Sequence, residues 1–194
     1  MSTNGATYAG GAGGVGNQLI QMLLDKGQTK IFSSYGNNSS RAALLKMGLK
    51  EELLVNYREA KNFVEEMKQK DGELPFDVVF DLVGKKMSEI SAKLLKIGGT
   101  YVDVTFFGTA DFREMLFDKA ATIVCVANYA YGADSSMHHH YHEKLAIISR
   151  MVEKGELRAP TLLVKRGLSK AVIDECHHLI DDNQTAGKKI VITL

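Results

Sequence analysis

Gly11-Ala12-Gly13-Gly14-Val15-Gly16, close to the start of the chain, fills every position of the pattern G-x-G-x-x-G. A short strand ending in Tyr8-Ala9-Gly10 precedes it, and an apolar helical pattern follows. In this setting Gly11 allows the turn, Gly13 lets the backbone approach a pyrophosphate, and Gly16 lets the helix pack on the strand. The helix N-terminus adds unpaired N–H groups and a positive dipole end. The motif predicts a dinucleotide site; the alternative is a glycine-rich turn without a ligand.

The composition is that of a globular protein. The 194 residues carry a formal net charge of +1 and are 24% charged, so we expect no nucleic-acid or membrane partner. We find no signal-peptide pattern and no apolar run long enough to span a bilayer, and expect a cytoplasmic location, with the mitochondrial matrix as the alternative. Cys125 and Cys176 lie in apolar contexts and are expected to be buried thiols.

Apolar strands alternate with amphipathic helices along the chain. We expect strands at 29–33, 53–55, 76–81, 101–104 and 121–126, and helices at 40–47, 59–70 and 86–96, the last ended by Gly98-Gly99. Such strands between amphipathic helices indicate a parallel sheet covered on both faces. The predicted class is α/β, a doubly wound Rossmann sheet of about six strands in the order 3-2-1-4-5-6.

The end of the second expected strand decides between cofactors. A carboxylate there binds the adenosine ribose hydroxyls and repels a 2′-phosphate. Residues 33–41 contain no acid but offer hydroxyls, amides and one guanidinium, including Ser33, Ser34, Ser39 and Arg41. This favours NADP(H) over NAD(H) and disfavours S-adenosylmethionine. The alternative is a polar loop with Arg41 solvated on the next helix.

Further motifs follow in a recognisable order. They lie at 8–16, 44–48, 55–59, 76–84, 94–99, 152–157 and 187–191, and include Phe76-Asp77-Val78-Val79-Phe80-Asp81-Leu82-Val83-Gly84. In this order and spacing the chain resembles the medium-chain dehydrogenase/reductases of the zinc-independent quinone oxidoreductase type. The resemblance covers nearly the whole chain.

The resemblance implies a set of cofactor contacts. The pyrophosphate turn would comprise Gly11, Gly13, Gly14, Val15 and Gly16. The adenosine ribose and its 2′-phosphate would lie near Ser33, Ser34, Ser39, Arg41 and Tyr57, with Val83 and Gly84 beside the ribose. The nicotinamide site would be lined by Phe106, Phe107 and Gly108, and Lys188 would return towards the cofactor. The alternatives are that Val83 and Phe106 are core residues and Tyr57 a surface aromatic.

The chain also departs from that family. Its members have an upstream barrel-like catalytic domain, whereas this sequence starts at the first nucleotide-binding strand. We expect residues 1–157 to form an NADP(H)-binding Rossmann domain. We expect 158–194 to form a strand-helix-strand segment that would pack on the absent catalytic domain. The chain is then the cofactor half of a longer enzyme, and its exposed apolar edges favour a homo-oligomer.

No metal site and no catalytic residue are predicted. Zinc needs three or four Cys, His or acidic ligands, and the chain has no C-x-x-C. His138 and His142 stand at i and i+4, but a solvated loop or helix start is the preferred interpretation. Asp81 and Asp103, near strand ends, are expected to bond nearby backbone rather than to supply a proton.

Two functions remain open. The first is NADPH-dependent reduction of a small-molecule quinone, enone or other carbonyl compound by hydride transfer. The second is an NADPH-binding regulatory module, or a remnant, without turnover. A short-chain reductase is rejected because the Tyr57/Lys61 pair lies far too close to the glycine turn.

Overall fold

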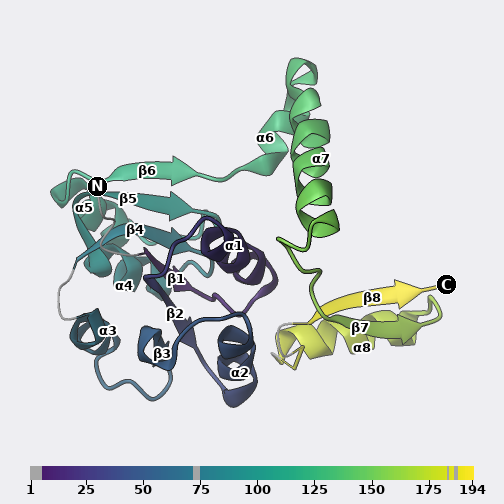
Figure 1. Ribbon diagram of the computed structural model, residues 1–194, viewed down its shortest axis with the longest axis horizontal. Helices are drawn as coiled ribbons and strands as arrows, with labels where there is room; N and C mark the ends of the chain where they lie inside the picture. The colour runs from purple at the N-terminus through teal and green to yellow at the C-terminus, as the bar shows by residue number, and fades with distance from the viewer. Residues whose placement is uncertain (1–5, 72–74, 183, 186–187) are drawn as a thin grey trace.

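The computed structural model describes residues 6–71, 75–182, 184–185 and 188–194 (Figure 1). Its main element is a six-stranded sheet in the order β3-β2-β1-β4-β5-β6, and every neighbouring pair is parallel. The strands are β1 (Ala6–Ala9), β2 (Ile31–Tyr35), β3 (Leu54–Asn56), β4 (Phe76–Asp81), β5 (Leu95–Asp103) and β6 (Thr122–Cys125). The predicted α/β class and strand order are therefore confirmed.

Helices cover both faces of this sheet. On one face, Ile31 of β2 packs in a buried cluster with Ile20 and Leu44, which belong to α1 (Gly14–Asp25) and α2 (Asn38–Lys46). On the other, Phe32 packs in a second cluster with Met67 and with residues of the three helices α3 (Phe63–Asp71), α4 (Lys86–Leu94) and α5 (Ala110–Asp118). Neighbouring strand residues thus point to opposite layers, as the pleat requires. A short 3-10 helix, η1 (Glu51–Leu53), leads into β3.

The junction of α4 and β5 differs from the prediction. Gly98-Gly99 does not end the helix but lies inside β5, which begins at Leu95. The pairing with β4 shifts register between Phe76 and Val78, and Gly98 has a φ of +69°. Glycine adopts that left-handed conformation without steric cost, so the strand bulges here and still continues along β4.

The chain leaves the sheet after β6. This strand is the edge of the sheet and all four of its residues are exposed, so the prediction of a buried Cys125 is wrong; Cys176 is buried as expected. Next come α6 (Asn128–Ala133), η2 (Ser135–Met137) and α7 (His139–Glu153), which extends away from the sheet (Figure 1). None of the helices in the described residues is long and apolar enough to cross a membrane.

The C-terminal segment forms a second, smaller unit. It consists of β7 (Leu162–Arg166), α8 (Lys170–Asp181) and β8 (Lys189–Thr193), and its two strands pair in parallel outside the main sheet (Figure 1). The predicted strand-helix-strand arrangement is thus present.

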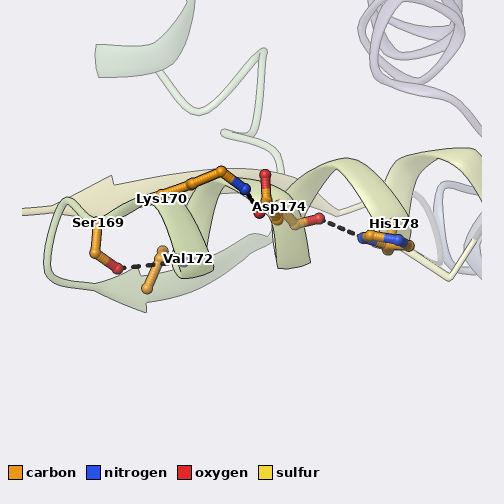
Figure 2. A network of polar contacts seen from close by, with 5 residues as sticks. All are labelled: Ser169, Lys170, Val172, Asp174 and His178. Atoms are coloured by element: carbon orange, nitrogen blue, oxygen red, sulfur yellow. Dashed lines mark hydrogen bonds and ion pairs between the residues drawn. The ribbon is translucent and has the colours of Figure 1, made fainter.

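Helix α8 is stabilised by its own polar side chains (Figure 2). The Ser169 hydroxyl caps the helix by accepting a hydrogen bond from the Val172 backbone N–H at 3.3 Å. The Lys170 ammonium pairs with the Asp174 carboxylate one turn later at 2.6 Å, and His178 Nδ1 lies 2.6 Å from the Asp174 carbonyl oxygen. This network is internal to the helix and leaves no convergent site.

Candidate functional site

The glycine turn between β1 and α1 is a tightly packed backbone cradle. The Gly13 N–H donates to the Gly10 carbonyl at 3.0 Å, and Gly13 is the N-cap of α1. A Cβ on Gly11 would lie 2.1 Å from Ser33 Oγ of β2, and one on Gly16 only 2.6 Å from the Gly11 Cα. A side chain at Gly16 would require a backbone shift, and one at Gly11 would require the Ser33 and Ile20 side chains to move. The cradle therefore leaves the N-terminus of α1 open to an anionic group.

A cavity of about 420 Å³ adjoins this cradle. Four of the predicted site residues line it, namely Gly13, Ser34, Tyr57 and Val83. The remaining lining residues are Gly10, Ala12, Tyr35, Gly36, Asn37, Ser40, Arg58, Leu82, Met87 and Thr185. Among the described residues that line it there is no carboxylate. The cavity follows the carboxyl ends of β1, β2, β3 and β4, where doubly wound sheets bind their ligands.

Three other residues predicted at the adenosine end stand outside this lining. Ser33 is fully buried under Gly11, and its hydroxyl donates to the Ser34 carbonyl at 3.4 Å. Ser39 is exposed on the first turn of α2. Arg41, two residues further along α2, faces Glu51 of η1 rather than the cavity.

The start of α2 supplies cavity residues that the sequence analysis did not nominate. Asn37 is the N-cap: its side-chain oxygen accepts from the Ser40 N–H at 2.8 Å, and the Ser40 hydroxyl lies 3.2 Å from the Asn37 N–H. The spacing N-x-x-S at the end of a strand was the available signal for this capping box. Tyr57 closes over the same loop, because a Cβ on Gly36 would lie 2.3 Å from its hydroxyl.

Asp81 fixes the turn that contains Val83 and Gly84. One carboxylate oxygen accepts from the N–H groups of Val83 at 3.0 Å and Gly84 at 2.7 Å. The other accepts from the hydroxyls of Ser88 at 2.5 Å and Tyr101 at 2.7 Å. Burial and then the hydrogen bond to Asp81 raise the pKa of Tyr101, so its hydroxyl remains a donor. The backbone-bonding role expected for Asp81 is confirmed.

The loop after β5 lies against the turn after β4. Asp103 accepts from the N–H groups of Thr105 and Phe106 at 3.0 and 2.9 Å, again as expected. The Lys85 N–H donates to the Phe107 carbonyl at 2.7 Å, which joins the two loops. The Phe106 side chain is 80% exposed. The structure thus places Phe107 beside Gly84 and Gly108 beside Lys85, and the described lining of the cavity includes none of Phe106, Phe107 and Gly108.

The C-terminal unit reaches the glycine cradle with Lys189 rather than with Lys188. A Cβ on Gly14 would lie 2.4 Å from the Lys189 ammonium nitrogen, so that cation rests on the first turn of α1. The Lys188 N–H donates to the carbonyl of Thr185, which itself lines the cavity. Arg158 ties the units together, because its N–H donates to the Gln21 side chain of α1 at 2.9 Å. Lys189 could not be nominated from the sequence, because its contact with Gly14 joins opposite ends of the chain.

These features define a Rossmann fold: a doubly wound sheet with a glycine cradle at the first helix. The chain belongs to the zinc-binding dehydrogenase family, whose model matches residues 14–150. The resemblance to medium-chain dehydrogenase/reductases of the quinone oxidoreductase type is confirmed by this match and by the relatives described next.

Among its relatives is the quinone oxidoreductase of Rattus norvegicus, which is 25% identical over 185 residues, covering 94% of this chain and 53% of that protein. The quinone oxidoreductase from Coxiella burnetii superposes with a TM-score of 0.68 at 24% identity, over 97% of this chain and 52% of that one. The 2-octenoyl-CoA carboxylase reductase CinF of Streptomyces sp. is known in complex with NADP and 2-octenoyl-CoA. It superposes with a TM-score of 0.69 at 20% identity, over 98% of this chain and 44% of that one. The chain therefore spans about half the length of the curated relative that it matches.

The family name implies zinc, but the described part of this chain does not fit it. No group of three or more His, Cys, Asp or Glu residues there could hold a metal ion. The histidines at the start of α7 bond backbone instead: His138 Nε2 lies 3.1 Å from the Gly132 carbonyl and His139 Nδ1 lies 2.8 Å from that of Ser136. No step of the chemistry is therefore assigned to a metal.

Proposed function

We propose that this chain is the cofactor-binding part of an NADPH-dependent oxidoreductase that reduces a small-molecule quinone, enone or other carbonyl compound. The observation that carries the proposal is the glycine cradle opening into a cavity whose described lining has no carboxylate. A pyrophosphate fits the cradle, and an extra phosphate meets no like charge in the cavity. The quinone oxidoreductase relatives and the NADP complex of CinF support the same reaction class.

Each part of the site has a proposed task. The backbone of residues 11–16 and the Lys189 ammonium would hold the pyrophosphate, with Lys188 beside them. Ser34 and Tyr57 would contact the adenosine ribose, and Val83 and Gly84 the second ribose. Residues 106–108 would line the nicotinamide, which supplies the hydride when bound.

The division of the chain is part of the proposal. We assign residues 1–157 to cofactor binding and 158–194 to a segment that packs on further catalytic structure. Leu162 and Val164 of β7 are about half exposed, at 52% and 50%, so one face of that unit is uncovered. Apolar strand surfaces of this kind favour association, and we propose that the assembly is also homo-oligomeric.

A second candidate is an NADPH-binding module without turnover. It is favoured by the exposure of Phe106 and Phe107, 80% and 64%, at the end of the site where hydride transfer would take place. Hydride transfer requires the protein to position the nicotinamide and exclude water. In the described structure these two aromatic side chains leave that end open to solvent.

The test is a titration of the full chain with NADPH and with NADH, following nicotinamide fluorescence. We expect binding of both, with NADPH preferred by about tenfold, since one charge-assisted contact contributes at least that much. Gly13→Val is the matched control: its backbone is extended, at φ −71° and ψ 174°, and the new methyls would block the pyrophosphate. Because a Cβ there lies only 3.2 Å from the Gly10 carbonyl oxygen, circular dichroism first checks that this variant is folded. Binding of neither nucleotide by the folded chain would refute the proposal. NADPH oxidation with added quinone then separates the enzyme from the module.

A further inference from the structure

Arg58 is the one charged side chain among the described residues that line the cavity. The neighbouring lining residues are neutral: Tyr57 directly after β3, and Asn37 and Ser40 at the start of α2. An anionic group at this end of the cavity would therefore meet a guanidinium and no opposing carboxylate. Arginine presents its N–H donors as a fork that matches phosphate oxygens.

The backbone that carries Arg58 is fixed rather than loose. The Arg58 N–H donates to the Asn56 side-chain oxygen at 3.0 Å, and the Tyr57 N–H donates to the Tyr35 carbonyl at 3.0 Å. The guanidinium carbon lies 5.9 Å from the centre of the Tyr57 ring, within the range of a cation–π contact. Among the described residues no carboxylate pairs with Arg58, so its charge is not neutralised there.

Arg41 is in the opposite situation. Its Nε lies 2.9 Å from Oε1 of Glu51 and its Nη2 lies 2.7 Å from Oε2, a two-point pairing that uses the face of the guanidinium a phosphate would need. Arg41 is absent from the cavity lining. A phosphate beside this pair would face a carboxylate as well as a cation, and the two charges sum to zero.

We propose that Arg58, and not Arg41, binds the 2′-phosphate of NADPH and sets the preference for that cofactor. This inference rests on the proposed function and assigns its specificity to one residue. Arg41 instead anchors α2 to η1 through Glu51 and holds the capped start of α2 in place. The selectivity for the 2′-phosphate then comes from the loop after β3, which carries Arg58, rather than from α2, which carries Arg41.

The test compares two fragments that differ in the 2′-phosphate, 2′,5′-ADP and 5′-AMP, as competitors of bound NADPH in the full chain. For the wild type we expect 2′,5′-ADP to bind about tenfold or more tightly. Arg58→Gln should reduce this ratio to near one by weakening 2′,5′-ADP alone. Arg58→Lys should retain part of it, because the charge stays and the fork is lost. Arg58 is exposed, so these variants should keep the wild-type melting temperature.

Arg41→Gln and Glu51→Gln are the matched controls at the competing site. We expect both to leave the 2′,5′-ADP to 5′-AMP ratio within about twofold of the wild type. The proposal would be overturned if Arg41→Gln lost the preference for 2′,5′-ADP and Arg58→Gln kept it. A marked increase of that preference in Glu51→Gln, which frees Arg41, would overturn it as well. Equal binding of the two fragments by the wild type would also overturn the assignment to Arg58, while leaving the proposal that the cavity binds a nucleotide in place. If neither NADPH nor NADH binds, it is the proposed function that fails.

Discussion

At the scale of single residues, Asp81 holds the turn after β4 in place through hydrogen bonds, although it does not itself line the cavity. It is 1% exposed and accepts four hydrogen bonds, two from the turn beside the cavity and two from the hydroxyls of Ser88 and Tyr101. A buried carboxylate is tolerated only when its acceptors are satisfied in this way. The residue therefore links the stability of the sheet to the shape of the pocket.

We expect Asp81→Asn to destabilise the protein by about 1–3 kcal/mol, because the amide turns an N–H donor towards groups that are themselves donors. Tyr101→Phe removes one donor and should cost about 1 kcal/mol. Urea unfolding measures both changes. Asp118→Asn, at the exposed end of α5, is the control and should stay within about 0.5 kcal/mol of the wild type. Equal losses at Asp81 and Asp118 would contradict the network.

At the scale of elements, the start of α1 depends on glycine in a position-specific way. Gly16→Ala would bring a Cβ to within 2.6 Å of the Gly11 backbone, whereas Gly14→Ala meets only the flexible end of Lys189. We expect Gly16→Ala to lose about 1–3 kcal/mol and Gly14→Ala to remain within about 0.5 kcal/mol. Thermal unfolding of the two variants separates them. A large loss in Gly14→Ala would show that the helix start, not the close packing, requires glycine.

The same elements show what sequence can predict. The apolar run of β4 was predicted with its observed bounds, and the glycine motif located the cradle, because both signals are local. The α4–β5 junction was misplaced, since Gly98 serves a bulge inside a strand and its neighbours in sequence do not reveal that. The histidine tract, interpreted from the sequence as a solvated loop or helix start, lies at the start of α7.

For the site residues, the sequence predicts those whose position depends on neighbouring residues and misses those whose contacts are distant in the chain. Ser34 lies near the end of β2 and Tyr57 directly follows β3, and the structure brings them to one cavity. Arg41 was nominated because it was the one guanidinium in an acid-free loop, and the partner that occupies it, Glu51, lies ten residues away. Lys189 reaches Gly14 across almost the whole chain, so only the folded arrangement reveals it.

At the scale of the whole molecule, the sheet ends in an uncovered edge. All four residues of β6 are exposed, with Ile123 and Val124 at 48% and 43%, and α7 leaves the sheet instead of covering this strand (Figure 1). An exposed apolar edge strand is a template for pairing with another strand. A second copy offers the same edge, and a two-fold axis would pair β6 with β6 in an antiparallel ladder.

We therefore expect the chain to sediment as a dimer at micromolar concentration and Val124→Lys to shift it to a monomer, because a charge on an edge strand opposes such pairing. Leu168→Lys is the matched control: Leu168 is 64% exposed but lies after β7, away from this edge. Analytical ultracentrifugation distinguishes the species. A wild-type monomer, or equal dissociation by both substitutions, would exclude the β6 edge as the interface. If instead Val124→Lys is monomeric and still binds NADPH like the wild type, the cofactor site is complete within one chain.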